Sequence, residues 1–171
     1  MSSSPVLVWF RRDLRLSDHP ALHAACATGR PVIPVFIHDD PVAGLGAAPK
    51  WRLGLGLEAF AQALEAAGSR LILRRGSARD TLQALIQETG AGAVYWSRLY
   101  DPDAVARDTA VKSSLKEQGI EARSFGGHLM FEPWTVETNA GGCYKVHNPV
   151  WHMVKGRDLQ APRTGARDIH S

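Results

Sequence analysis

The chain has 171 residues, of which 44% are hydrophobic and 22% charged, and its formal net charge is +3. A chain of this length and composition can bury one sizeable hydrophobic core, so one folded domain is expected. The isoelectric point near 9.1 is only mildly basic, which by itself does not indicate nucleic-acid binding.

The cysteines and the N-terminus indicate the cellular environment. Cys26 and Cys143 lie far apart with no CxxC pair, so neither a disulfide framework nor a zinc site is indicated. The N-terminal residues MSSSPVLVWF carry no basic leader, and their apolar run is too short to span a bilayer. We expect a reduced, cytoplasmic protein that is neither exported nor inserted in a membrane.

Short apolar, β-branched runs alternate with longer segments of helical period as far as Phe125. The first pattern favours buried strands and the second favours helices. The predicted strands are Val6 to Phe10, Val32 to Ile37, Arg70 to Leu73, Ala93 to Trp96 and Glu121 to Phe125, and the predicted helices are His19 to Ala27, Trp51 to Ala67, Ala78 to Glu88 and Pro102 to Gln118.

A glycine follows the last periodic residue of each predicted helix, at Gly29, Gly68, Gly90 and Gly119. Glycine is the residue that most readily adopts the left-handed conformation of a helix C-cap. The alternation predicts an α/β fold with a five-stranded parallel, doubly wound, Rossmann-like sheet, whose ligands are expected at the carboxyl ends of the strands. The candidate residues at that rim are Arg11, Arg12, His38, Asp39, Asp40, Ser97 and Arg98.

Four charges follow the first predicted strand at once: Arg11, Arg12, Asp13 and Arg15. They either form local ion pairs that fix the turn into the first helix or contact an anionic ligand at the strand end. Ser17 or Asp18 is expected to cap that helix, which would begin at His19 or Pro20.

The glycine run GLGAAPKWRLGLG, residues 44–56, suggests a dinucleotide-binding loop at first sight. Pro49 stands where the third glycine of that motif should be, and the run follows its strand through a long loop. No phosphate-binding G-x-x-x-x-G-K-[ST] motif occurs in the sequence. The run therefore predicts a mobile loop that leads into a helix at Trp51.

Two further groups of residues resemble functional sites but have simpler structural explanations. His19 and His23 are spaced to share a metal ion on a helix, but no third ligand is evident, so a solvated helix face is favoured. Ser97, His128 and Asp101 have the residue types of a hydrolytic triad, but no G-x-S-x-G elbow surrounds the serine.

The segment VYWSRLYDPDAVARD, residues 94–108, runs from a strand into a helix whose first turn carries Asp101 and Asp103. Acidic residues there favour the helix dipole. Aromatic residues beside an acidic pair could also hold a flat, nitrogen-rich ring. Both interpretations stay open.

The alternation stops after Phe125. The tail contains Phe131, Trp134, Tyr144 and Trp151, which is too aromatic for a simple disordered linker. A short helix is possible around residues 148–155, and the residues from Pro162 onward are expected to form a frayed terminus.

Four segments in order resemble the N-terminal α/β domain of the DNA photolyase and cryptochrome family: WFRRDLRLSDHPAL, GSRLILRRG, VYWSRLYDPDAVARD and FEPWTVETNAGGCYKVHNPVW. The resemblance runs from about Pro5 to Pro162. It implies an α/β domain over residues 1–126 and a connector over residues 127–171 toward a helical domain that lies outside this chain. In the family that helical domain carries flavin adenine dinucleotide (FAD) and the DNA-binding groove, so repair activity and direct DNA binding are not expected from this chain alone.

The resemblance also implies a role for the α/β domain, which in many members holds a light-harvesting antenna chromophore. That chromophore is methenyltetrahydrofolate or a deazaflavin, and it passes excitation to the flavin. The residues that match the family's antenna region are Phe36, His38, Lys50, Trp51 and Asp101.

The sequence departs from the family pattern near this region. Ser97 stands where close relatives show asparagine, and Ala104 stands where some folate-binding members carry glutamate. Arg52, Gly54 and Gly56 replace bulkier residues. A lost carboxylate removes a ring partner and added glycine loosens the helix, so the pigment class stays open.

Three functions from different classes remain. The first is an antenna domain of a photolyase without repair activity of its own. The second is a stand-alone module that binds a chromophore or nucleotide, or that docks on a separate helical partner through its aromatic connector. The third is a small nucleotide-dependent enzyme, which only fold analogy supports.

Overall fold

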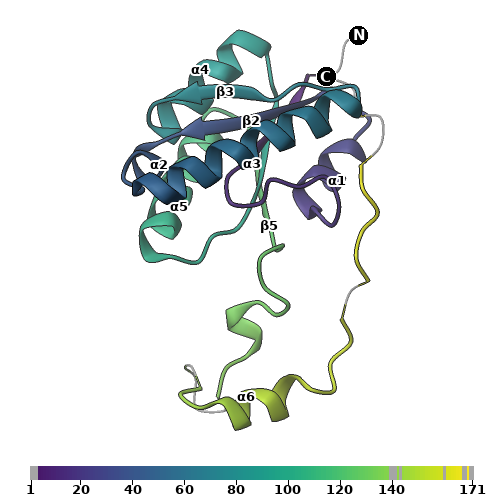
Figure 1. The fold of residues 1–171 in the computed structure, drawn as a ribbon, viewed down its shortest axis with the longest axis vertical. Helices are drawn as coiled ribbons and strands as arrows, with labels where there is room; N and C mark the ends of the chain where they lie inside the picture. Colours follow the sequence, from purple (N-terminus) through teal and green to yellow (C-terminus); the bar gives the residue numbers. More distant parts are fainter. Residues whose placement is uncertain (1–3, 139–141, 143, 160, 167–168, 170–171) are drawn as a thin grey trace.

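The computed structural model describes residues 4–138, 142, 144–159, 161–166 and 169. Its sheet has five strands in the order β3-β2-β1-β4-β5 (Figure 1), and every neighbouring pair is parallel. The sheet thus confirms the predicted doubly wound α/β fold. The strands are β1 (Val6–Phe10), β2 (Val32–His38), β3 (Ile72–Arg75), β4 (Ala93–Ser97) and β5 (Glu121–Phe125).

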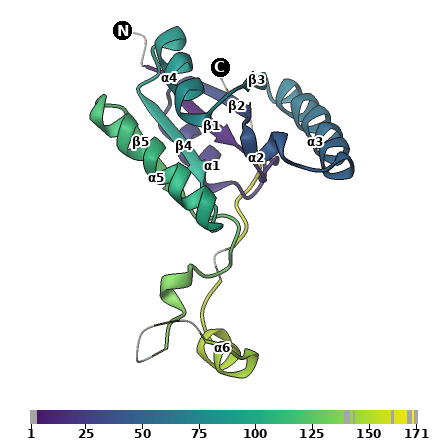
Figure 2. The ribbon, with the colours of Figure 1, turned by 90° about the vertical axis from the view of Figure 1, so that its left-hand side faces the viewer.

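Helices cover both faces of this sheet (Figure 2). They are α1 (Pro20–Cys26), α2 (Asp40–Ala43), α3 (Ala47–Ala66), α4 (Ala78–Thr89), α5 (Pro102–Glu117) and α6 (His147–Val154), with a 3₁₀ turn η1 (Pro133–Thr135). Leu82 of α4 and Leu115 of α5 pack on one face of the sheet. Leu22 of α1 and Phe60 of α3 pack on the other. The central strands β1 and β4 are buried on both faces, which explains their unbroken apolar sequence.

The segment after β2 differs from the prediction. The mobile loop expected before Trp51 is helical from Ala47 onward, because α3 begins four residues earlier than predicted. The short helix α2 precedes it, and its N-cap Asp39 accepts a hydrogen bond from Val42 N at 3.3 Å. Pro41 lies in the first turn of α2, where its missing N–H is not needed. The glycines of the run at residues 44–56 interrupt the apolar pattern, so the start of this helix was not predicted.

The cap of α1 also differs from the prediction. His19 is the N-cap, and its Nδ1 accepts a hydrogen bond from Leu22 N at 3.1 Å. Ser17 and Asp18 were expected in that role. The four predicted helix-terminating glycines do have positive φ angles, at 66° for Gly29, 82° for Gly68, 67° for Gly90 and 73° for Gly119.

The C-terminal segment returns to the α/β domain (Figure 1). Asp18 N donates to the carbonyl of Arg163 at 3.0 Å, and Ile169 N donates to the carbonyl of Ala67 at 3.1 Å. Ile169 is 1% exposed and belongs to the core cluster under α1 and α3. The expectation of a frayed terminus from Pro162 onward is therefore wrong for the described residues, because an apolar side chain near the end of the chain completes that core.

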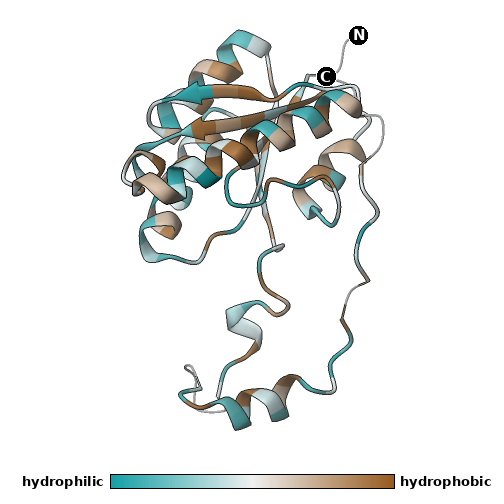
Figure 3. Cartoon of the chain, viewed as in Figure 1, coloured by the Kyte–Doolittle hydropathy of each residue, from teal (hydrophilic) through white to brown (hydrophobic). Residues whose placement is uncertain are grey.

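The connector between β5 and the returning segment extends away from the sheet and carries η1 and α6 (Figures 1 and 3). The helix expected around residues 148–155 is present as α6. Several large apolar side chains of the connector are exposed: Leu129, Met130, Trp134, Val146, Trp151, Met153 and Leu159. Among the described residues, no helix combines the length and the hydropathy needed to cross a membrane.

Candidate functional site

The charges after β1 form long-range ion pairs at the carboxyl end of the sheet. Arg11 Nη1 donates to both carboxylate oxygens of Asp108 in α5, at 2.8 and 2.7 Å, and its Nη2 donates to the carbonyl of Ser97. The side chains of Arg11 and Asp108 are 8% and 13% exposed. Burial lowers the pKa of Arg11, and the contact with Asp108 opposes this shift.

A second arginine extends this network. Arg107 donates to Asp39 at 2.8 Å and to Asp108 at 3.0 Å. Its guanidinium carbon lies 5.0 Å from the ring centre of Trp9, while that of Arg11 lies 4.4 Å from the same ring. Cation–π attraction strengthens as such groups are desolvated. The network ties α5 and the end of β2 to β1.

The expectation of local ion pairs holds for Asp13, which pairs with His19, but it is wrong for Arg11 and Arg12, whose partners lie far away in the sequence. The strand order reverses between β1 and β4, which is where doubly wound sheets bind ligands. Here Arg11 bridges from β1 to α5, and Arg12 pairs with Asp101 at 2.8 Å. The protein's own side chains thus occupy this part of the rim.

Asp13 and His19 form a buried pair beside this network. His19 Nε2 lies 2.8 Å from Asp13 Oδ2, and both side chains are almost fully buried. Because Nδ1 of His19 accepts the N–H of Leu22, the proton of the neutral ring must sit on Nε2 and point to Asp13. Burial alone would raise the pKa of Asp13, but hydrogen bonds from His19 and from Arg11 N outweigh it and hold that pKa well below its usual range.

The metal and hydrolase interpretations gain no support. Both ring nitrogens of His19 are already used in hydrogen bonds, so this residue is not free to share a metal with His23. In the part of the chain that the structure describes, no group of three or more His, Cys, Asp or Glu side chains is placed to hold a metal ion. Asp101 is engaged by Arg12.

The five predicted antenna residues lie on three different elements. Phe36 is a core residue of β2 at 3% exposure, and His38 ends that strand. Lys50 and Trp51 are exposed near the start of α3, with Trp51 at 69% exposure. Asp101 is the N-cap of α5, and its carboxylate makes no capping hydrogen bond. All three positions lie toward the carboxyl end of the sheet, yet no hydrogen bond or ion pair recorded among the described residues joins any two of the five.

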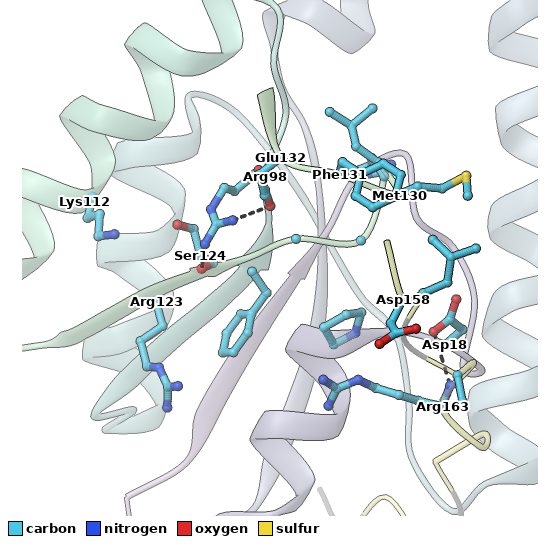
Figure 4. Close-up of a pocket in the computed structure, with 18 of the residues that line it drawn as sticks. Asp18, Arg98, Lys112, Arg123, Ser124, Met130, Phe131, Glu132, Asp158 and Arg163 are labelled. Atoms are coloured by element: carbon cyan, nitrogen blue, oxygen red, sulfur yellow. Dashed lines mark hydrogen bonds and ion pairs between the residues drawn. The ribbon is translucent and has the colours of Figure 1, made fainter. Parts of the chain in front are cut away.

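A pocket of about 800 Å³ opens between the end of β5, the connector and the returning segment (Figure 4). Figure 4 shows Lys112 and Arg123 on one side and Asp18, Asp158 and Arg163 on the other. None of the five predicted antenna residues lines it. Apolar and glycine residues complete its walls: Pro20, Ala122, Phe125, Gly126, Gly127, Leu129, Met130, Phe131, Leu159 and Ala161.

Glu132 is the centre of a polar cluster in the wall of this pocket. Arg98 Nη1 donates to its Oε1 at 2.5 Å, and Tyr100 OH donates to its Oε2 at 2.8 Å. Burial and the neighbouring Glu132 carboxylate raise the pKa of Tyr100 to about 12. Sequence reasoning missed this cluster, because a single acid in FEPWT gives no signal of its partners.

His128 also lines the pocket. Its Nε2 is buried and has no hydrogen-bond partner among the described residues. Burial lowers the pKa of His128, with Arg15 and Arg11 adding to the shift and Asp13 opposing it. Burial thus disfavours the charged form of this imidazole, and its Nε2 is left without a hydrogen-bond partner among the described residues.

Comparison with known proteins gives consistent matches over nearly the whole chain. The family model for DNA photolyase matches residues 6–165. The chain is 47% identical over 158 residues to a deoxyribodipyrimidine photo-lyase of Agrobacterium fabrum, covering 92% of this chain and 33% of that protein. It is 40% identical over 161 residues to Cryptochrome-2 of Arabidopsis thaliana, covering 91% of this chain and 26% of that protein.

A solved structure agrees with these matches. The crystal structure of a bacterial class III photolyase from Agrobacterium tumefaciens superposes with a TM-score of 0.92 at 46% identity, covering 96% of this chain and 34% of that one. The chain thus spans about a third or less of the length of these relatives.

Proposed function

The chain belongs to the DNA photolyase family and matches its N-terminal α/β domain, and we propose that it holds an antenna chromophore. The pigment would be methenyltetrahydrofolate or a deazaflavin. The domain would pass excitation to a flavin and would not repair DNA by itself. We also propose a cytoplasmic location, in keeping with a sequence that has two distant cysteines and no CxxC pair.

The main support for the antenna proposal is an exposed aromatic side chain near the carboxyl ends of the strands, where doubly wound sheets bind ligands. Trp51 is 69% exposed near the start of α3. An uncovered indole on a rigid helix offers a stacking surface for a flat ring. His38, at the end of β2, has a buried Nδ1 without a hydrogen-bond partner among the described residues, which a polar ring atom could satisfy.

The absence of repair activity is proposed because of what the chain spans. The chain matches about a third of the photolyases it resembles. The family resemblance implies that FAD and the DNA-binding groove belong to the remaining part. An antenna domain itself needs a rigid pocket that orients a pigment, without an acid, base or nucleophile.

The test is a spectroscopic titration of the purified chain with methenyltetrahydrofolate, a deazaflavin and FAD. We expect saturable uptake of one of the first two, seen as a shifted near-ultraviolet or blue band. Trp51→Ala should weaken that binding about 5- to 150-fold, since a base–aromatic stack contributes ~1–3 kcal/mol. Trp151→Ala, which removes another exposed tryptophan from α6, is the matched control. A chain that takes up neither pigment would refute the proposal.

Asp101 provides a second, independent test of the same site. Asp101→Asn should weaken pigment binding if this carboxylate contacts the ring, whereas Asp103→Asn in the first turn of the same helix should not. The ion pair with Arg12 is solvent-exposed, so its loss should change the free energy of unfolding by less than about 1 kcal/mol. If both variants bind the pigment equally well, Asp101 does not contact the pigment and acts only as a negative charge at the start of α5.

A second candidate function is docking, which the connector favours. Its exposed apolar residues include Trp134, Val146 and Trp151, and contiguous exposed apolar surface marks interaction sites. The proposed partner is a helical FAD-binding domain, in cis or in trans, with no direct DNA contact from this chain. Mixing the chain with the separately expressed C-terminal part of the Agrobacterium photolyase should give a complex that Trp151→Ser weakens and Trp51→Ser does not. No complex by analytical ultracentrifugation would count against docking.

A further inference from the structure

Glu132 connects the connector to two residues that follow β4. Its two carboxylate oxygens accept hydrogen bonds from Arg98, at 2.5 Å, and from Tyr100, at 2.8 Å. The side chains of Arg98 and Glu132 are only partly exposed. A charge-assisted hydrogen bond in such a position is stronger than one between neutral groups.

Arg98 contacts the exit of the connector at several further points. Its backbone N donates to the carbonyl of Phe125 at 2.7 Å, and its Nη2 donates to the carbonyl of Ser124 at 3.0 Å. Its guanidinium carbon lies 5.5 Å from the ring centre of Trp134. One side chain of the α/β domain therefore contacts the end of β5, the acid at Glu132 and the first exposed aromatic residue after it.

The backbone at the exit is shaped to allow this contact. A Cβ atom at Gly126 would lie 2.7 Å from Oε1 of Glu132, so a side chain there would push the carboxylate away from Arg98. Gly127 has a φ of 155°, which only glycine adopts readily. Its carbonyl accepts a hydrogen bond from Arg15 Nη2 at 2.8 Å. Figure 4 shows the chain passing from Ser124 around to Glu132 above the pocket.

From these contacts we propose that Glu132 is a latch that fixes residues 126–135, which lead from β5 into the connector, against the α/β domain before any partner binds. The latch rests on the docking role proposed above. It holds the Phe125–Glu132 wall of the pocket in place and presents Trp134 in one orientation. A pre-ordered docking segment loses less conformational entropy on association than a free one, so Glu132 acts as a positioning residue for docking.

The test is ¹⁵N relaxation of the backbone in the chain alone. We expect order parameters of about 0.8 or more for residues 126–135 in the unmodified protein, falling below about 0.6 in Glu132→Ala, on the scale that separates rigid from flexible backbone. Gly126→Ala should lower the order parameters less than Glu132→Ala does, because it displaces the flexible end of the Glu132 side chain without removing its carboxylate. Glu137→Ala is the control, since Glu137 is exposed just after this segment and has no ion pair among the described residues.

Unchanged order parameters in Glu132→Ala, with β1 as rigid as before, would overturn the latch. A segment already flexible in the unmodified protein would overturn it too. Glu132→Gln should give an intermediate value, because the amide oxygen keeps one acceptor but loses the charge. None of these measurements needs a partner, so the latch can hold even where docking fails, and a rigid segment that binds no partner would refute docking alone.

Discussion

Replacing Ile169 with alanine should destabilise the α/β domain, although the residue lies near the end of the chain. Its side chain is 1% exposed in the core cluster that includes Leu22, Phe60 and Leu64. Removing its outer carbons forfeits about 0.8 kcal/mol for each buried methylene-sized group. Together with an incompletely closed cavity this gives a loss of about 2–4 kcal/mol.

The loss of stability caused by Ile169→Ala has an upper limit. Ile169 is held by one backbone hydrogen bond to Ala67, and the returning segment can detach as a unit. The cost of the substitution cannot exceed the free energy with which that segment docks. We therefore expect the lower part of the range, about 2 kcal/mol, which corresponds to a fall in Tm of ~4–8 °C for a domain of this size.

Urea unfolding followed by circular dichroism measures this loss. Leu159→Ala is the control, because Leu159 is 57% exposed in the connector just before the returning segment and should change the unfolding free energy by less than about 0.5 kcal/mol. If Ile169→Ala and Leu159→Ala prove equally stable, then the returning segment does not belong to the core and the domain ends before it.

Three other predictions follow from single residues. The pKa of Asp13 is lowered in the folded state, so the stability that its carboxylate contributes should be present above about pH 4 and lost as the pH falls through the folded-state pKa. In urea titrations from pH 6 to pH 2, the free energy of unfolding should therefore fall less steeply for Asp13→Asn than for the unmodified protein. The pKa of Tyr100, about 12, should fall but stay above 10 in Glu132→Gln, because burial remains when the charge is gone, and ultraviolet titration of the phenol measures it. Gly90→Ala should lower the free energy of unfolding by about 1 kcal/mol, since Gly90 caps α4 in the left-handed conformation. Gly54→Ala should raise it by ~0.5–1 kcal/mol, because Gly54 lies in a helix with open space where a Cβ atom would lie. Thermal melts in which both variants shift Tm in the same direction would contradict this.

The fold could be predicted because the pattern of apolar residues is strong in the sheet. Val6–Phe10 and Ala93–Ser97 are buried on both faces, so their sequences are nearly continuous apolar runs. The glycines after the helices marked the helix ends. The predicted edge strand begins two residues before β3, because the exposed Arg74 and Arg75 interrupt the apolar pattern at the end of this strand.

The candidate site was harder to predict because its contacts join distant parts of the chain. Arg11 and Asp108 are 97 residues apart in sequence, and Arg98 and Glu132 are 34 residues apart. Neither pair has a spacing that a local pattern encodes. The burial of Ile169 was missed for a related reason, since a single apolar residue among polar neighbours shows no period.

The charges that follow β1 carry a further consequence for where a ligand can bind. Arg11 is committed to Asp108, Arg12 to Asp101 and Asp13 to His19, while Arg15 donates to the carbonyl of Gly127. These residues tie α5, α1 and the connector to the central strand. Because the half-exposed Arg12–Asp101 pair is the weakest of these ties, it is the one a pigment could displace at small cost. Arg12 contacts only Oδ2 of Asp101, so under the proposed antenna role a pigment ring would either contact Oδ1 with the ion pair in place or contact Oδ2 after Arg12 has left.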